Sequence, residues 1–163
     1  MPRVLVVANQ TLGGTRLLQA IRDRMDQGPC ELTLLVPATP HAERESTMEM
    51  LGRSLGTALP PPDNSQRAVE ADYDYARSRL DVALGQLRQL GTAPDGTVGD
   101  PNPLRAIADA LTRRHCDEII LSTLPSGVSR WLGQDLPHKI RRKFKIPLTV
   151  VTASRSGGRP SDR

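Results

Sequence analysis

Short apolar runs along the chain alternate with longer amphipathic stretches. Four of the runs show no alternation of apolar and polar positions: residues 4–8, 32–36, 118–121 and 148–151. Runs of this length and kind are typical of strands that are buried on both faces of a parallel sheet. A fifth, weaker strand is expected within residues 92–99, because the chain must return to the sheet after the long helical stretch that precedes them.

Helical periodicity separates these strands. Apolar side chains recur at three- and four-residue spacing in residues 15–26, 65–90, 103–116 and 136–144. Asn102 before Pro103 predicts a helix start, since Asn caps free N–H groups and Pro suits the first helical position. We expect Asp135 to cap the last helix, and Gly28 and Gly91 to end the first two.

The order of these elements predicts a single α/β domain with a doubly wound, five-stranded parallel sheet and helices on both faces. We expect the domain to cover residues 1–153. It would carry a mobile insert or lid at residues 37–64, whose middle holds a weak helical pattern, and a disordered basic tail at residues 154–163. Ligands of such sheets bind at the carboxyl ends of the strands, which here means above all the loop at residues 122–134.

Composition limits the class of protein. Aromatic side chains make up only 2% of the 163 residues, so the core must be aliphatic. Cys30 and Cys116 are far apart and form neither a CxxC pair nor a metal-ligand spacing, which favours reduced thiols and a cytoplasmic protein. No run of 18 apolar residues and no signal-peptide pattern occurs, so we expect no membrane association.

Charge is divided unevenly along the chain. Residues 1–100 hold 10 basic and 13 acidic side chains, whereas residues 101–163 hold 12 basic and 5 acidic ones. The basic groups at 138–145 either bind an anionic partner or form a solvated helix face that complements the helix dipole. We do not expect nucleic-acid binding, because neither interleaved aromatic residues nor a known base-reading module is present.

Three segments together resemble the universal stress protein family: GDPNPLRAIADAL, then DEIILSTLPSG, and a closing IPLTVV. The resemblance lies in order and spacing, and it covers the chain apart from residues 37–64 and the tail. It implies the adenine nucleotide alpha hydrolase-like architecture with strand order 3-2-1-4-5. It also implies a homodimer formed through the last strand, residues 148–151.

One branch of that family binds ATP through the marker G-x2-G-x9-G-[S/T] after the fourth strand. At the family's spacing, the four marker positions are Ser122, Pro125, Asp135 and Leu136, and none of them matches. Glycines there let backbone N–H groups approach phosphate oxygens, whereas a Pro has no N–H and an Asp repels phosphate. Asn9 also stands where this branch usually has Asp. We therefore expect no cofactor, and ATP remains an alternative.

Two strand-to-helix junctions hold the candidate ligand-binding residues. A Gly-Gly-Thr turn, and a loop with hydroxyls and one Arg, suit a phosphate, a carboxylate or another small anion. They equally suit turns that satisfy their own backbone, so both interpretations stay open. The candidates are Asn9, Thr11, Gly13, Gly14, Thr15, Ser122, Thr123, Ser126, Gly127, Ser129 and Arg130, with Val36 and Gly99 at neighbouring strand ends.

Catalysis has little support, because the three histidines are scattered and no nucleophile elbow, carboxylate pair or metal cluster is apparent. Three functions remain. The first is a non-catalytic regulatory or stress-response domain. The second is a nucleotide- or anion-binding protein that uses the loops at 13–15 and 122–130. The third is an interaction module whose basic C-terminal face binds an acidic protein or nucleic acid.

Overall fold

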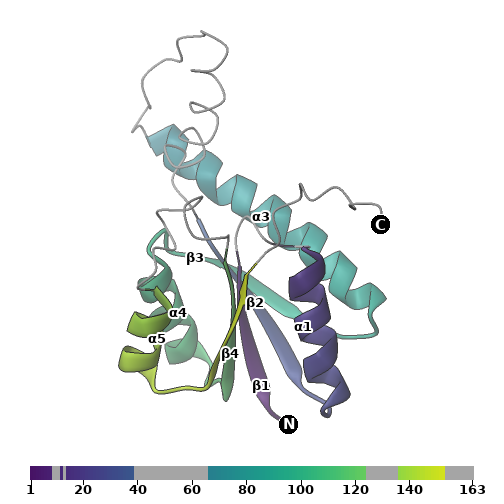
Figure 1. Ribbon diagram of the computed structural model, residues 1–163. Coiled ribbons are helices and arrows are strands. Elements are labelled where there is room, and N and C mark those ends of the chain that lie inside the picture. Colours follow the sequence, from purple (N-terminus) through teal and green to yellow (C-terminus); the bar gives the residue numbers. More distant parts are fainter. Residues whose placement is uncertain (9–11, 13, 39–65, 124–135, 153–163) are drawn as a thin grey trace, which may run out of the picture.

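The computed structural model describes residues 1–8, 12, 14–38, 66–123 and 136–152 (Figure 1). Its elements are β1 (Arg3–Val7), α1 (Thr15–Asp26), β2 (Glu31–Pro37), α3 (Gln66–Gln89), β3 (Asp95–Gly99), α4 (Pro103–Arg113), β4 (Glu118–Thr123), α5 (Leu136–Phe144) and β5 (Leu148–Thr152). The five strands form one parallel sheet in the order β3-β2-β1-β4-β5. The predicted fold class and strand order are therefore confirmed.

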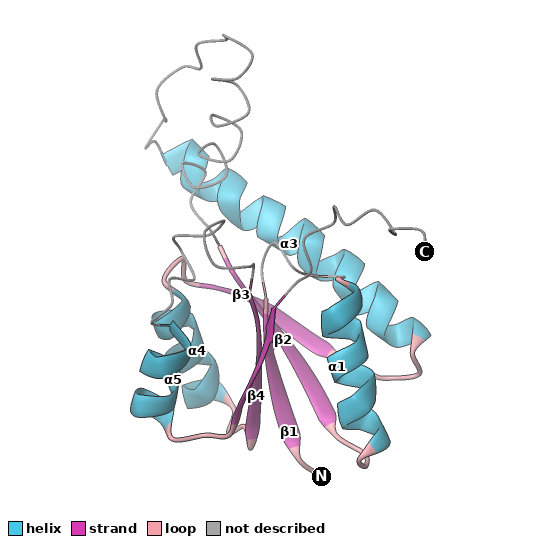
Figure 2. Ribbon diagram, viewed as in Figure 1, coloured by secondary structure: helices cyan, strands magenta, loops and turns pink. Residues whose placement is uncertain are grey.

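Helices cover both faces of the sheet (Figure 2). Alternate residues of the central strand β1 serve the two faces: Val4 and Val6 belong to the apolar cluster under α1 and α3, whereas Leu5 and Val7 belong to the cluster under α4 and α5. All four side chains are buried, and each contributes about 1.5–3 kcal/mol by leaving water. The absence of polar alternation in β1 thus follows from burial on both faces.

The predicted helix boundaries agree with the structure to within a few residues. Asn102 Oδ1 accepts hydrogen bonds from the backbone N–H groups of Leu104, at 3.0 Å, and Arg105, at 3.3 Å, which confirms the expected cap of α4. Gly28 and Gly91 follow α1 and α3 with φ angles of 148° and 86°, which glycine adopts at no steric cost.

Two boundaries were predicted wrongly. β4 runs two residues further than expected, because Ser122 and Thr123 continue the ladder opposite Val151 and Thr152 of β5. They are strand residues and do not belong to the loop in which we placed them. Similarly, Pro37 was assigned to the insert but is the last residue of β2, where it pairs with Gly99 and precedes the buried Ala38.

Several predictions lie outside the described residues. These are the character of residues 39–64, the tail at 154–163, and the capping role of Asp135. No helix in the described ranges is long and apolar enough to cross a membrane. In the same part of the chain both cysteines are free thiols, Cys116 buried and Cys30 half-buried.

Candidate functional site

The carboxyl ends of all five strands lie at the same end of the sheet, since every neighbouring pair is parallel. We call this end of the sheet the strand-end edge. The strands end at Val7, Pro37, Gly99, Thr123 and Thr152. Ligands of doubly wound sheets bind at this edge, next to the point where the strand order reverses. Here that point lies between β1 and β4.

Gly14 and Thr15 stand at this point, at the beginning of α1. Gly14 is the N-cap residue, in an extended conformation, and its carbonyl oxygen accepts a hydrogen bond from the N–H of Leu18 at 3.1 Å. Neither a side-chain cap nor an acidic residue in the first turn compensates the N-terminal charge of α1. The partial positive charge of this helix end therefore faces the strand-end edge.

Arg16 is a residue of this edge that the sequence argument missed. Its Nη1 donates a hydrogen bond to the backbone carbonyl oxygen of Thr152 at 3.2 Å, so it joins the first turn of α1 to the end of β5. The residues are 136 positions apart. The signal in the sequence was an Arg directly after the Gly-Gly-Thr turn, but nothing there showed that β5 ends beside it.

Ser122 and Thr123 close β4 at the same edge, and their side chains are buried. As buried strand residues paired with Val151 and Thr152 of β5, they offer a ligand less surface than a loop would. Val36 is fully buried in the cluster under α1 and α3, so its side chain is part of the core.

Gly99 serves close packing between β3 and α4. A Cβ atom at this position would lie 2.8 Å from the Cβ of Ala106 and 2.9 Å from Cδ1 of Leu35. Its carbonyl oxygen also accepts a hydrogen bond from the N–H of Ala38 at 3.0 Å. The two close approaches to Ala106 and Leu35 give Gly99 a structural reason for lacking a side chain.

Two marker positions of the ATP-binding branch fall on described residues. Ser122 is 2% exposed at the end of β4, and Leu136 is 6% exposed at the beginning of α5. Leu136 belongs to the apolar cluster between the sheet and the helices α4 and α5. Its side chain therefore packs in the core where the marker has a hydroxyl. Pro125 and Asp135 lie outside the described residues.

The remaining candidates also lie outside the part of the chain that the structure describes. They are Asn9, Thr11, Gly13, Ser126, Gly127, Ser129 and Arg130.

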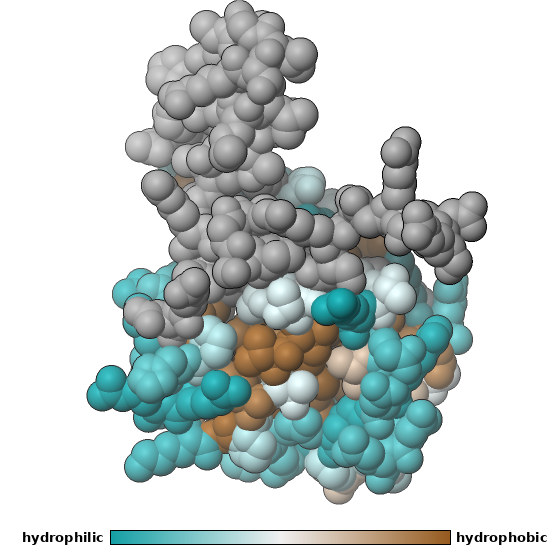
Figure 3. All heavy atoms as spheres, viewed as in Figure 1, coloured by the Kyte–Doolittle hydropathy of each residue, from teal (hydrophilic) through white to brown (hydrophobic). Residues whose placement is uncertain are grey.

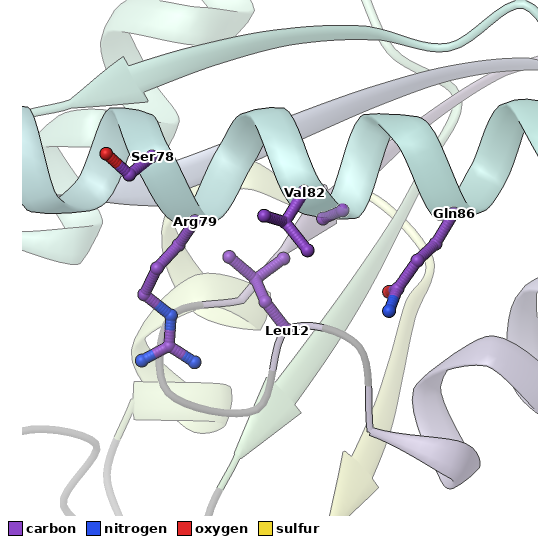
Figure 4. A pocket seen from close by; sticks show the side chains of 6 residues that line it. Leu12, Ser78, Arg79, Val82 and Gln86 are labelled. Atoms are coloured by element: carbon purple, nitrogen blue, oxygen red, sulfur yellow. The ribbon is translucent and has the colours of Figure 1, made fainter.

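A groove of about 300 Å³ lies beside this edge, between Leu12 and α3 (Figure 4). Leu12 lies opposite Arg79 and Val82, and Ser78, Ala83 and Gln86 complete the lining. Gln86 Oε1 is buried there without a hydrogen-bond partner. The sequence argument assigned this stretch of α3 to a packing stripe and did not predict the groove.

Shifted pKa values are found among contacts at the opposite edge of the sheet. The Glu118 carboxylate, to which Arg24 donates a hydrogen bond, raises the pKa of Arg24. Burial raises the pKa of the Cys116 thiol. The backbone N–H of Arg3 and the imidazole of His115 lower the pKa of Asp117. Arg24, Cys116 and Asp117 lie near the amino ends of β1 and β4, and their contacts link different elements of the fold.

No group of three or more potential metal-ligating side chains comes together within the described ranges. What the described strand-end edge offers a ligand is the open helix end at Gly14 and the guanidinium group of Arg16. Both are features that favour an anion.

No family model and no curated protein matches this sequence. Solved structures do. A universal stress protein family protein from Arabidopsis thaliana, determined with AMP bound, superposes with a TM-score of 0.55 at 10% identity, over 99% of this chain and 97% of that one. A universal stress protein from Archaeoglobus fulgidus superposes with a TM-score of 0.55 at 16% identity, over 93% and 98%. The chain therefore has the fold of universal stress proteins.

Proposed function

We propose that this chain is a non-catalytic, universal-stress-protein-like regulatory domain of the cytoplasm. It dimerises through β5, and its strand-end crevice does not hold ATP in the manner of the family's ATP-binding branch. The observation that carries the proposal is the burial of Leu136, 6% exposed, at the start of α5. The free thiols Cys30 and Cys116 support a reducing compartment.

The argument against the family's ATP site is one of packing. A phosphate loop needs backbone N–H groups at a helix N-terminus and, in this branch, a hydroxyl at the first helical residue. Leu136 offers no hydroxyl, and its side chain is committed to the core together with Ile140. At the end of β4, Ser122 adds a buried Cβ where the marker has Gly. The Arabidopsis neighbour carries AMP on the same fold, so adenine nucleotides are the right probes.

The edge strand β5 supports dimerisation. Among the described strands it pairs only with β4. Val150 is 36% exposed, and Thr149 and Thr152 are exposed as well. Figure 3 shows hydrophobic surface between hydrophilic flanks where Figure 1 draws the yellow-green strand β5. An exposed edge strand presents free N–H and C=O groups to a second strand, and a second copy would satisfy them.

Native mass spectrometry followed by a thermal-shift titration tests the nucleotide part. We expect a dimer without retained nucleotide, and a melting temperature that changes by less than about 1 °C with 1 mM ATP, ADP or AMP. A ligand present at a hundred times its Kd adds about 2.7 kcal/mol, which raises the melting temperature of a chain of this size by roughly 5–11 °C. Such a rise, or a bound nucleotide mass, would contradict the proposed loss of the site.

The dimer is tested separately by Val150→Lys, which places a charge on the edge of β5. Light scattering after gel filtration should show a dimer for the wild type and a monomer for this variant. Val82→Lys is the matched control, because Val82 is an exposed valine on α3. A monomeric wild type, or loss of the dimer in the control, contradicts dimerisation through β5 and leaves the nucleotide argument unchanged.

A second candidate function is the binding of a small anion at the start of α1. The contact that favours it is the hydrogen bond from Arg16 to Thr152, which holds the guanidinium group of a residue in the first turn of α1 at the end of β5. Inorganic phosphate should then raise the melting temperature of the wild type, and Arg16→Gln should abolish the rise. An equal rise in both proteins would exclude Arg16 as the ligand.

A further inference from the structure

Basic residues occupy the outer face of α5. The inner face carries Leu136 and Ile140, which are buried, and the half-buried Phe144. The exposed residues of this segment are His138, Lys139, Arg141, Arg142, Lys143 and Lys145, which together we call the α5 basic surface. At about 100° per residue, its side chains on the helix span roughly 200° of the helix circumference. Any partner that approaches α5 from solvent meets this surface first.

The helix dipole accounts for only part of the α5 basic surface. Arg141, Arg142 and Lys143 lie in the last turn, where cations are stabilised by the negative end of the helix. His138 and Lys139 lie in the first turn, at the positive end, and the first turn contains no acidic residue. The helix dipole therefore does not account for these two positions.

No acidic side chain of the described residues pairs with the α5 basic surface. Within the described ranges none of its six residues forms an ion pair, whereas Arg105 and Arg114 of the α4 region pair with Asp100 and Asp95. The nearest aromatic contact is internal: Lys143 Nζ lies 5.6 Å from the ring centroid of Phe144. Like charges at three- and four-residue spacing on this helix, such as Lys139 and Lys143, repel one another, and an anionic partner would relieve the repulsion.

A basic surface of this kind could bind an acidic protein, an anionic membrane or nucleic acid. The side chains of α5 favour nucleic acid. Protein interfaces centre on buried aromatic or aliphatic anchors, and helices that lie on membranes insert apolar side chains. The exposed large hydrophobic residues in the described ranges are Met1, Val69, Tyr75, Val82 and Val150, none of them on α5. A phosphate backbone requires only cations, and guanidinium groups bind phosphate through two parallel hydrogen bonds.

We propose that the α5 basic surface binds the phosphate backbone of nucleic acid without reading its sequence. Interleaved aromatic residues and base-reading modules, which the sequence lacks, serve to recognise bases. Contact with phosphates alone needs neither. This proposal does not depend on the state of the nucleotide crevice.

The expected affinity is modest and depends strongly on salt. Three to five phosphate contacts give a slope of log K against log salt of about −3 to −4.5, which is roughly a 100-fold loss between 50 and 200 mM salt. Fluorescence anisotropy with a labelled 20-base-pair DNA duplex and a 20-nucleotide RNA, each in two unrelated sequences, measures this slope. We expect binding at 50 mM salt that is equal for the two sequences.

A pair of triple variants localises the contact. Arg141→Gln, Arg142→Gln and Lys143→Gln together should weaken binding at least about 10-fold and make the slope less steep by about 2.7. The control removes the same charge from α3 through Arg67→Gln, Arg77→Gln and Arg88→Gln, all at exposed positions. The control should change the affinity less than about 3-fold, and circular dichroism melting checks that both variants fold.

Absence of binding at 50 mM salt overturns the proposal, and so does equal binding by the α5 variant and the wild type. Poly-glutamate and vesicles that contain phosphatidylserine distinguish the other polyanions. Competition by either one that equals competition by unlabelled duplex of the same charge would assign the surface to acidic proteins or to membranes instead. Weak competition by both supports a nucleic-acid surface.

Discussion

Arg24 of α1 and Glu118 of β4 form an ion pair, with Nε of Arg24 2.6 Å from Oε2 of Glu118. The two residues are 94 positions apart, and their side chains are only 14% and 23% exposed. The pair links α1 to the amino end of β4. Because water is largely excluded, each charge depends on the other for its hydrogen bond.

Replacing one partner of this pair should destabilise the fold. Arg24→Met leaves the Glu118 carboxylate partly buried without its donor, at a cost of about 2 kcal/mol in the free energy of unfolding measured by urea denaturation. The double variant with Glu118→Leu should recover much of this loss. Arg3→Met is the control, since the Arg3–Glu31 pair is 44% and 47% exposed and contributes at most about 0.5 kcal/mol. Equal losses in Arg24→Met and Arg3→Met would contradict the assignment.

Gly99→Ala should also destabilise the protein, because its Cβ would overlap with Ala106 and Leu35. We expect a loss of about 1–3 kcal/mol, as for other overpacked cores. Gly85→Ala on α3 is the matched control. A Cβ there meets no atom within 4 Å, and alanine favours the helix by about 1 kcal/mol, so this variant should be more stable than the wild type. Variants with the same sign would refute the packing role of Gly99.

The stability contributed by Asp117 should depend on pH in the acid range. The Asp117 carboxylate accepts a hydrogen bond from the N–H of Arg3 at 2.8 Å and lies 3.4 Å from Nε2 of His115, and these contacts lower its pKa from the ordinary 3.8. A lowered folded-state pKa contributes stability that is present above the unfolded value and is lost as the pH falls through the folded value.

The difference in stability between the wild type and Asp117→Asn should therefore shrink as the pH falls from about 5 to below 3.8. Urea unfolding followed by circular dichroism between pH 7 and pH 2.5 measures it. A difference that stays constant to the lowest pH would show that the carboxylate charge contributes nothing.

The two thiols should differ in reactivity. Burial of Cys116 raises the pKa of its thiol and shields it from reagents, whereas Cys30 is half-buried. Since the thiolate is the reactive form, Cys30 should react with iodoacetamide at pH 8 at least about 10-fold faster than Cys116. In Cys30→Ser only the slow phase should remain, and denaturant should remove it. A fast phase that persists in this variant would refute the burial of Cys116.

The sequence alone determined the architecture of this protein. Continuous apolar runs such as Val4–Ala8 have no polar face, so they required a sheet covered on both sides, and the spacing of helices between them required parallel crossovers. Asn102 with Pro103 fixed a helix start because capping depends on neighbouring residues only. The strand order followed from the family resemblance and is observed.

Tertiary structure decided where the strands end and which distant residues meet there. The end of β4 depends on its ladder with β5, so the sequence could not show that Ser122 and Thr123 are strand residues. The hydrogen bond of Arg16 to Thr152 joins residues 136 positions apart, and the pair of Arg24 and Glu118 joins residues 94 positions apart. Local patterns specify elements because their causes are local. Sites are made by contacts between distant elements, and those contacts exist only after the sheet has brought the elements together.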